Sequence, residues 1–451
     1  MFILRISLLS CLLYFCYSWI YQFFLIMNYH HEPNISQDSC CSEVESEDDS
    51  IHPFEISVSE QDMRDIHLRL NISRGFTPAL EGTQHDYGLN EKVLKTILEH
   101  LRNYNFTERQ HFLNAYPQFI TRINGMNIHF IHISPRNSDN VPVLPLLLLH
   151  GWPSSVREFY EAIPVLLAGQ DGHFSIELVI PSLTGFGYSD GPTKLGCHSP
   201  HVGNLMRLLM ERLGHRRFYV HGSDWGAVVA TGMTTMFPES VIGLHSNFCF
   251  SLRYITLLKT VLGSLYPSMV VDEEYVSKMY PLITGILRFY ISESAYMHMF
   301  GTKPDTIGHG LDNSLEGLIS FLFEKFSIGK NKLNLHVPSA GVTDIEVMKL
   351  LDIILFYYWF PKKATTSARF YSENLGIEGL LNGLHNSPIS DSVPCGCAYF
   401  EDDFIYQPQS FLKDKFTNLV HYSTYKSVGH FAAIEATNLL ADDILSFINK
   451  V

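Results

Sequence analysis

Two kinds of hydrophobic spacing alternate along the chain and predict strands separated by helices. Short apolar runs have the length and the β-branched or aromatic character of strands. They are QFITRING (118–125), MNIHFIHI (126–133), VLPLLLLHG (143–151), IELVIPSL (176–183), RFYVHG (217–222), VIGLHSN (241–247), CGCAYFED (395–402) and LVHYSTY (419–425). The first two predict a hairpin around Asn124-Gly125. Because helical patterns separate most of the others, we expect a mainly parallel sheet.

Helical spacing prevails in two longer regions, one before the first strand and one inside the sheet. Residues 51–115 look helical and amphipathic, and Ser59-x-x-Asp62 is a candidate capping box ahead of an apolar run. From about residue 250 to 390, Leu, Met, Phe and Tyr recur at helical spacing. The chain then closes on a helix, FAAIEATNLLADDILSFIN (431–449). A sheet interrupted by a helical insertion after its sixth strand resembles an α/β-hydrolase with a lid.

The amino end carries a long apolar run. Residues 2–27 contain one charge, Arg5, and residues 6–27 are about 22 long, close to the ~20 that cross a bilayer. A cleaved signal peptide is the alternative, but its apolar core would usually be only about 7 to 15 residues, followed by a small-residue cleavage site. No clear A-x-A site follows. We therefore expect a retained transmembrane anchor over residues 1–27 and a polar, acidic linker over residues 28–50.

The orientation of such an anchor is contested within the sequence. Arg5 is the only Lys or Arg before Arg64, which would leave the amino terminus in the cytosol and the body in the lumen. Glycosylation sequons at Asn34, Asn71 and Asn105 fit a lumenal body, although such triplets also occur by chance.

Composition narrows the functional classes. The formal net charge of −14 argues against a nucleic-acid partner, which would need a basic face. The chain has 8 cysteines, but Cys40 and Cys41 are adjacent and Cys395-Gly396-Cys397 is too tightly spaced for a zinc knuckle. We expect neither a disulfide framework nor a metal site.

The segment FYVHGSDWGAVVA (218–230) has the strand–turn–helix context of a nucleophile elbow, G-x-Nu-x-G. The central position usually holds serine, but here it is Asp224. A carboxylate is already anionic at neutral pH, since its reference pKa is ~3.9. It is a poor acyl nucleophile and serves instead for displacement at an sp3 carbon. The elbow therefore predicts an alkyl-ester intermediate formed from an epoxide or an alkyl halide.

The partners expected of this elbow follow it in the order acid, then histidine. Glu401-Asp402-Asp403 follows one late strand and His430 follows the next, while His150-Gly151-Trp152-Pro153 stands where an oxyanion loop belongs. His430, oriented by a carboxylate, would activate water to attack the ester. The backbone N–H groups of Trp152 and Trp225 would hold the oxyanion. Each motif alone is weak evidence for such a site, but their occurrence together in the expected order is specific evidence for it.

The leaving group separates the two possible substrates. A halide leaves as an anion and needs N–H donors, typically indoles of the lid. An epoxide oxygen needs an acid, and a tyrosine with a reference pKa of ~10 stays protonated at neutral pH and can donate. Of the 4 Trp, only Trp359 lies in the insertion, which is rich in Tyr. An epoxide is therefore the favoured substrate.

From about Phe54 to the carboxyl end, the chain resembles the microsomal epoxide hydrolases, including the juvenile hormone epoxide hydrolases. The motifs that carry the resemblance are PFEIS, RGFTP, NAYPQF, HFIH, HGWP, EFYEAIP, PSLTGFGYSD, GSDWG, YMHMFGTKPDTIGHGLDNS, RFYSENLG and GHFAAIE. The resemblance implies that Asp224 is the nucleophile and His430 the base. It further implies that Tyr371 and Tyr296 donate a proton to the epoxide oxygen, and that an anchor precedes a body facing the cytosol.

Three features depart from the family pattern. Ser223 stands where the family usually has a second glycine, and serine is small enough for the turn to survive. The acid that orients the histidine is commonly Glu in the microsomal branch, whereas the matching position here is Asp403, with Glu401 and Asp402 as alternatives. The cytosolic orientation conflicts with the argument from Arg5, and here we follow the family.

The sequence thus predicts an α/β-hydrolase in four parts. They are an anchor (1–27), an acidic linker (28–50), a helical extension with the first strands (51–137), and a hydrolase domain (138–451) with its lid at about 250–390. The predicted enzyme converts lipophilic epoxides and water to vicinal diols at the endoplasmic reticulum membrane, without metal or organic cofactor. The alternatives are a haloalkane dehalogenase, which would need more lid Trp, and a non-catalytic lipid-binding protein, which often lacks a catalytic residue.

Overall fold

The computed structural model describes residues 48–135, 141–169, 173–376, 379 and 384–451. The predicted anchor and nearly all of the predicted linker lie outside these residues, as does the predicted domain boundary at 137/138. Among the helices that are described, none combines the length and the apolar character that a membrane crossing requires.

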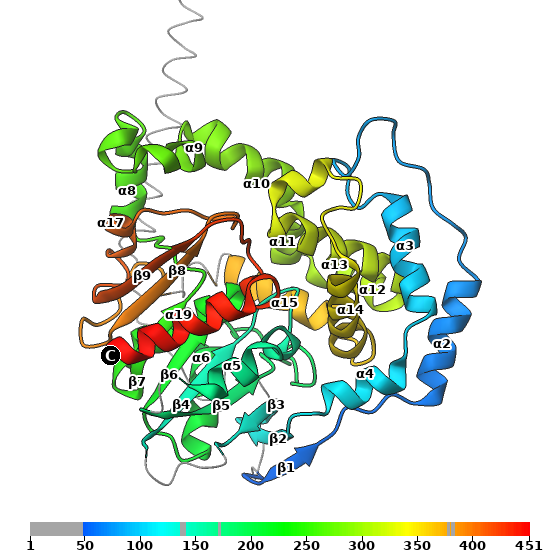
Figure 1. Ribbon diagram of the computed structural model, residues 1–451, viewed down its shortest axis with the longest axis horizontal. Coiled ribbons are helices and arrows are strands. Elements are labelled where there is room, and N and C mark those ends of the chain that lie inside the picture. The colour runs from blue at the N-terminus through cyan, green and yellow to red at the C-terminus, as the bar shows by residue number, and fades with distance from the viewer. Residues whose placement is uncertain (1–47, 136–140, 170–172, 377–378, 380–383) are drawn as a thin grey trace, which may run out of the picture.

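A nine-stranded sheet organises the molecule in the order β1-β2-β3-β5-β4-β6-β7-β8-β9 (Figure 1). The strands are β1 (Ile51–Phe54), β2 (Gln118–Ile123), β3 (Met126–Ile133), β4 (Val143–Leu149), β5 (Ser175–Pro181), β6 (Phe218–Gly222), β7 (Val241–Ser246), β8 (Cys395–Phe400) and β9 (Leu419–Tyr425). Neighbours from β1 through β3 to β5 are antiparallel, and all pairs from β5 to β9 are parallel. The mainly parallel sheet expected from the alternating pattern is confirmed.

The first strand differs from the helical region expected there. Ile51–Phe54 pairs with β2 and forms one edge of the sheet. The segment is short and mostly exposed, so it carries no period-2 pattern to identify it. Pro53 has no N–H to donate, which an edge strand tolerates.

Helices flank the sheet. Helices α6 (Ser199–Arg212) and α7 (Asp224–Met236) pack against each other, and α5 (Ala162–Ala168) packs against α19 (Thr437–Lys450). The closing helix predicted over 431–449 is in fact two, because α18 (Ala432–Glu435) is separated from α19 at Ala436. The Glu435 carboxylate accepts hydrogen bonds from the amides of Gly429 and Phe431. It thereby holds α18 against the loop that carries His430.

A helical insertion separates β7 from β8, as expected. Within the described residues its longer elements are α8 (Tyr254–Gly263), α11 (Ala295–Thr302), α12 (Pro304–Asn313), α13 (Leu315–Lys330), α14 (Asp344–Asp352), the π-helical η7 (Ile353–Trp359) and α15 (Ala364–Leu375). The extension contributes α2 (Glu60–Asn71), α3 (Glu91–Arg102) and α4 (Phe106–Leu113), which lie along the outer side of α12–α14 in Figure 1. The predicted capping box is present at the start of α2, between Ser59 and Asp62.

One buried carboxylate ties the extension, the sheet and the insertion together. Asp352, at the end of α14, accepts hydrogen bonds from the Tyr104 hydroxyl at 2.6 Å and from the guanidinium of Arg109 at 2.6 and 2.9 Å. Arg157, in the loop after β4, donates to the same carboxylate at 2.9 Å. Because an unpaired buried charge is costly, this network fixes the three parts relative to one another.

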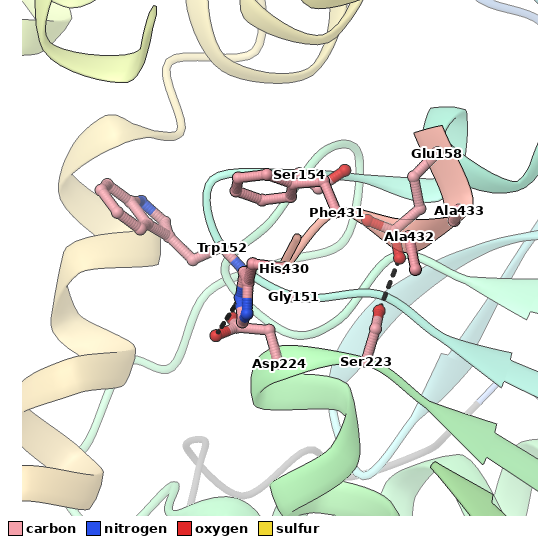
Figure 2. Close-up of a pocket in the computed structure, with 10 residues that line it drawn as sticks. All are labelled: Gly151, Trp152, Ser154, Glu158, Ser223, Asp224, His430, Phe431, Ala432 and Ala433. Atoms are coloured by element: carbon pink, nitrogen blue, oxygen red, sulfur yellow. Dashed lines mark hydrogen bonds and ion pairs between the residues drawn. The ribbon is translucent and has the colours of Figure 1, made fainter. Parts of the chain in front are cut away.

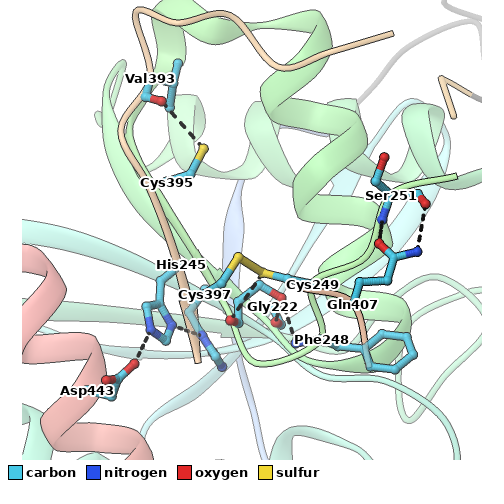
Figure 3. The surroundings of a disulfide bond; sticks show 12 residues. Gly222, His245, Phe248, Cys249, Ser251, Val393, Cys395, Cys397, Gln407 and Asp443 are labelled. Carbon is cyan, nitrogen blue, oxygen red and sulfur yellow. Dashed lines mark hydrogen bonds and ion pairs between the residues drawn. A yellow bond between two sulfur atoms is a disulfide. The ribbon is translucent and has the colours of Figure 1, made fainter. Parts of the chain in front are cut away.

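A disulfide between Cys249 and Cys397 shows that the expectation of no disulfide was wrong (Figure 3). Cys249 lies just beyond β7 and Cys397 lies in β8, and the two cysteines are 148 residues apart in the sequence. The sheet places β7 beside β8 with Ser246 opposite Cys397. Only this strand order, which cysteine spacing does not reveal, brings the two sulfur atoms together.

Candidate active site

A strained turn projects Asp224 from the sheet. β6 ends at Gly222 and α7 begins at Asp224, whose φ of +46° lies in the left-handed region that non-glycine residues rarely adopt. A Cβ on Gly222 would lie 2.4 Å from the carbonyl oxygen of Gly226, and one on Gly226 would lie 2.1 Å from that of Leu149. Glycine is therefore required on both sides of the turn. Ser223 has an extended backbone (φ −112°, ψ 147°), so the departure from glycine is accommodated.

The structure brings Asp224, His430 and Asp403 together from three separate segments. His430 Nε2 lies 3.2 Å from Asp224 Oδ2 (Figure 2), and His430 Nδ1 lies 2.7 Å from Asp403 Oδ1. His430 and Asp403 are buried. The backbone N–H of His430 donates to the carbonyl of Gly329 in α13, which anchors the loop on the insertion.

The two alternative acids point to other partners. Glu401 accepts a hydrogen bond from the Tyr275 hydroxyl at 3.0 Å, and Asp402 accepts one from the Asn331 side-chain amide at 2.9 Å. Of the three consecutive acidic residues, Asp403 is thus the one that contacts His430.

Electrostatics favour a charged histidine in the resting site. Burial alone would lower the pKa of His430, but the carboxylates of Asp403 and Asp224 outweigh it and raise that pKa to about 10. The resting site is therefore an imidazolium held between two carboxylates.

The loop after β4 supplies a backbone donor to the Asp224 carboxylate. The amide N–H of Trp152 donates to Asp224 Oδ1 at 2.8 Å. A Cβ on Gly151 would lie 2.3 Å from that same oxygen, so the loop can approach only as glycine. Within the described residues, no hydrogen bond forms from the Trp225 amide to the resting carboxylate. Its predicted bond to the oxyanion stays a prediction.

The two predicted tyrosines lie near Asp224 and are packed on tryptophan rings. Tyr296 of α11 stacks on Trp152 with ring centroids 5.0 Å apart, and Tyr371 of α15 meets the ring of Trp225 edge-on at 4.9 Å. Burial raises the pKa of both hydroxyls above the usual range, and the nearby Asp224 carboxylate adds to the effect. Both side chains therefore remain protonated at neutral pH, as proton donors must.

A further acid, Glu158, lies beside this cluster and was not predicted to have a role. Glu158 and Ser154 line the same small cavity as Asp224 and His430 (Figure 2). Burial raises the pKa of Glu158 to about 7. The available signal was its place in EFYEAIP, just after the HGWP loop.

Comparison with known proteins assigns the chain to a family. A family described as the epoxide hydrolase N terminus matches residues 51–159, and one described as the alpha/beta hydrolase fold matches residues 145–247. The juvenile hormone epoxide hydrolase of Manduca sexta is 39% identical over 402 residues, which cover 89% of this chain and 86% of that protein. The chain belongs to the epoxide hydrolases.

Other epoxide hydrolases agree with this assignment. Epoxide hydrolase 1 of Sus scrofa is 36% identical over 410 residues, 89% of each chain. The crystal structure of juvenile hormone epoxide hydrolase from the silkworm Bombyx mori superposes with a TM-score of 0.88 at 38% identity, covering 92% of this chain and 99% of that one. This epoxide hydrolase is thus an enzyme with the α/β-hydrolase fold, as its sequence predicted.

Proposed function

We propose that the enzyme opens lipophilic epoxides to vicinal diols through a covalent ester on Asp224. The observation that carries the proposal is the position of that carboxylate. It sits at a strained elbow, bonded to the Trp152 amide on one oxygen and paired with His430 on the other. A carboxylate so held is placed to displace an oxygen from carbon, which a serine would not do.

In the first step an Asp224 oxygen attacks a ring carbon of the epoxide. The carbon–oxygen bond of the ring breaks, and Tyr371 or Tyr296 gives its proton to the released oxygen. In the second step His430 takes a proton from water, and the hydroxide attacks the ester carbonyl at Cγ of Asp224. The Trp152 amide stabilises the oxyanion.

The ester then collapses. The bond from Cγ to the substrate oxygen breaks, and His430 returns its proton to that oxygen, which becomes the second alcohol. The proton of the re-formed Asp224 carboxyl restores the tyrosine hydroxyl. Alkylation also removes the negative charge of Asp224, one of the groups that raise the pKa of His430. That pKa therefore falls, so the resting imidazolium can release its proton to solvent and act as a neutral base. It takes a proton back once the Asp224 carboxylate is re-formed.

The experiment is single-turnover mass spectrometry on His430→Gln. Without its base the enzyme should form the ester and stall, so its intact mass should rise by the mass of the epoxide. Asp224→Ala should show neither the added mass nor diol formation. An unmodified mass for His430→Gln throughout the reaction would refute the covalent route.

The substrate is proposed by chemical class. The relatives from Manduca sexta and Bombyx mori are named as juvenile hormone epoxide hydrolases, so this hormone is one candidate substrate. A panel of styrene oxide, stilbene oxide, an epoxy fatty acid and juvenile hormone, each assayed for diol formation, ranks the candidates. Release of bromide from an alkyl bromide should not occur.

Membrane location completes the proposal. Lipophilic epoxides partition into bilayers, and residues 6–27 have the length of a span, so we place the enzyme at the endoplasmic reticulum membrane. The family implies a cytosolic body, whereas the Cys249–Cys397 bond is typical of an oxidising compartment. Endoglycosidase treatment separates the two orientations, because the exposed Asn71 and Asn105 acquire glycans only in the lumen.

A further inference from the structure

A small cavity adjoins the catalytic cluster (Figure 2). Its volume is about 10 Å³, room for about one water molecule. Asp224 and His430 form one part of its wall, and Ser154, Ser223 and Glu158 form another. A water there would touch both the carboxylate that becomes the ester and the imidazole that acts as base.

Two polar groups of this wall, the Ser154 hydroxyl and the Glu158 carboxyl, can form further hydrogen bonds. Ser154 is 1% exposed, and within the described residues its hydroxyl makes no hydrogen bond of good geometry. The hydroxyl nevertheless lies near enough to Glu158 to lower the pKa of that carboxyl, against the larger effect of burial. Glu158 accepts a hydrogen bond from the Ser223 hydroxyl at 2.6 Å. A carboxylate can accept about four such bonds, so one serine does not saturate it. Buried groups left in this state are commonly completed by an internal water.

Glu158 is held in place by its neighbours. It lies in the short helical turn η1 (Val156–Phe159), all four residues of which are buried. The adjacent Arg157 is bonded to Asp352 and, at 2.8 and 3.0 Å, to the Glu161 carboxylate. The Ser223 hydroxyl fixes the carboxyl itself from the side of the elbow. A group fixed in this way can orient a small molecule at little further entropic cost.

We propose that this cavity holds the water that hydrolyses the Asp224 ester, and that Glu158 and Ser154 are positioning residues for it. The inference rests on the proposed two-step function. The Glu158 carboxyl and the Ser154 hydroxyl bind the water, and its oxygen faces Cγ of the ester. His430 takes one proton, the new C–O bond forms at Cγ, the bond to the substrate oxygen breaks, and that oxygen receives the proton from His430.

The test separates the two chemical steps. Enzyme is mixed with a slowly turned-over epoxide and quenched over time, and intact mass gives the rates of alkylation and of ester hydrolysis. Glu158→Gln and Ser154→Ala should each slow hydrolysis by about 10-fold or more, the loss expected for a hydrogen bond to a charged or reacting group. Alkylation should change by less than about 2-fold, because the water takes no part in it. The alkylated enzyme should therefore accumulate in both variants.

Glu161→Gln is the matched control in the same segment. It removes a carboxylate bonded to Arg157 but lies outside the cavity wall, so it should lower thermal stability and leave the ratio of the two rates unchanged. Hydrolysis at the normal rate in both test variants would overturn the proposal. So would an equal fall of both rates, or the same ratio change in Glu161→Gln. Failure of the two-step function is distinct, because then His430→Gln forms no ester at all.

Discussion

His430 is hydrogen-bonded to Asp403, with 2.7 Å between Nδ1 and Oδ1. Both side chains are buried, so little water screens the pair. The bond turns Nε2 of the imidazole toward Asp224. The preceding residue, Asp402, has the same chemistry but bonds to Asn331 instead.

On the proposed mechanism, this contact makes Asp403 the acid on which turnover should depend. Asp403→Asn should reduce diol formation by about 10³- to 10⁴-fold, because the imidazole loses both its orientation and its stabilising charge. Asp402→Asn should stay within about 2-fold of the wild type. Steady-state kinetics on any epoxide that the enzyme accepts compares the two, and equal losses would contradict the assignment.

The tyrosines should act on the first step. Tyr371→Phe or Tyr296→Phe removes one proton donor, and either change should slow alkylation by about 10- to 100-fold. The double variant should lose nearly all activity, because no acid then remains for the epoxide oxygen. Rapid-quench mass measurements isolate this step. A variant that slowed only ester hydrolysis would place the tyrosine elsewhere in the mechanism.

The charge on His430 should depend on Asp224. Because two carboxylates raise its pKa to about 10, the imidazole should remain protonated at pH 8 in the resting enzyme. Asp224→Asn, neutral like the ester, should lower that pKa, as followed by NMR of nitrogen-labelled histidine. A raised folded-state pKa stabilises the protein below about pH 6.5 and loses its effect as the pH rises toward 10. Thermal stability of the wild type should fall over that interval more than that of Asp224→Asn.

A second buried carboxylate should support stability rather than catalysis. Asp443 accepts hydrogen bonds from His245 at 2.8 Å (Figure 3), from His421 at 2.9 Å and from the Tyr425 hydroxyl at 2.8 Å. Burial would raise its pKa, but these partners outweigh burial and hold the pKa well below the usual range. Asp443→Ala should cost about 3 kcal/mol at pH 7, as expected for an unpaired buried network.

The pH dependence of that loss has a definite sign. A depressed carboxyl pKa stabilises the folded state above the unfolded value of ~3.9 and ceases to do so as the pH falls through the folded value. The gap between wild type and Asp443→Ala, measured by urea unfolding, should therefore narrow from pH 7 to pH 3. The exposed neighbour Asp442 gives the control, since Asp442→Ala should have little effect at either pH. A gap independent of pH would show that the hydrogen bonds to the ionised Asp443 carboxylate do not carry the stability.

Features that depend on the local sequence pattern could be predicted from the sequence. Apolar runs such as VLPLLLL identify strands because buried parallel strands are apolar on both faces. The Gly222 to Gly226 pattern identifies the elbow because only glycine fits the two close approaches around Asp224. The order of the motifs then pointed to His430 and Asp403, although they are far from Asp224 in the chain.

Features that depend on contacts between distant parts of the chain could not be predicted from the sequence. The sheet order, rather than any spacing, pairs Cys249 with Cys397. The break at Ala436 occurs next to Glu435, whose carboxylate accepts hydrogen bonds from two amides of the histidine loop. Nothing in the local sequence distinguishes Glu158 from other acidic residues, because its contact with Ser223 is formed only in the fold.

The Cys249–Cys397 bond also closes a ring in the polypeptide. Its two ends stand just after β7 and within β8, so the bond encircles the whole helical insertion. A protease that nicks the insertion would leave two fragments still joined, which would migrate as one band until a reductant is added. The bond would then keep β7 and β8 side by side even while the helices of the insertion are cut or unfolded.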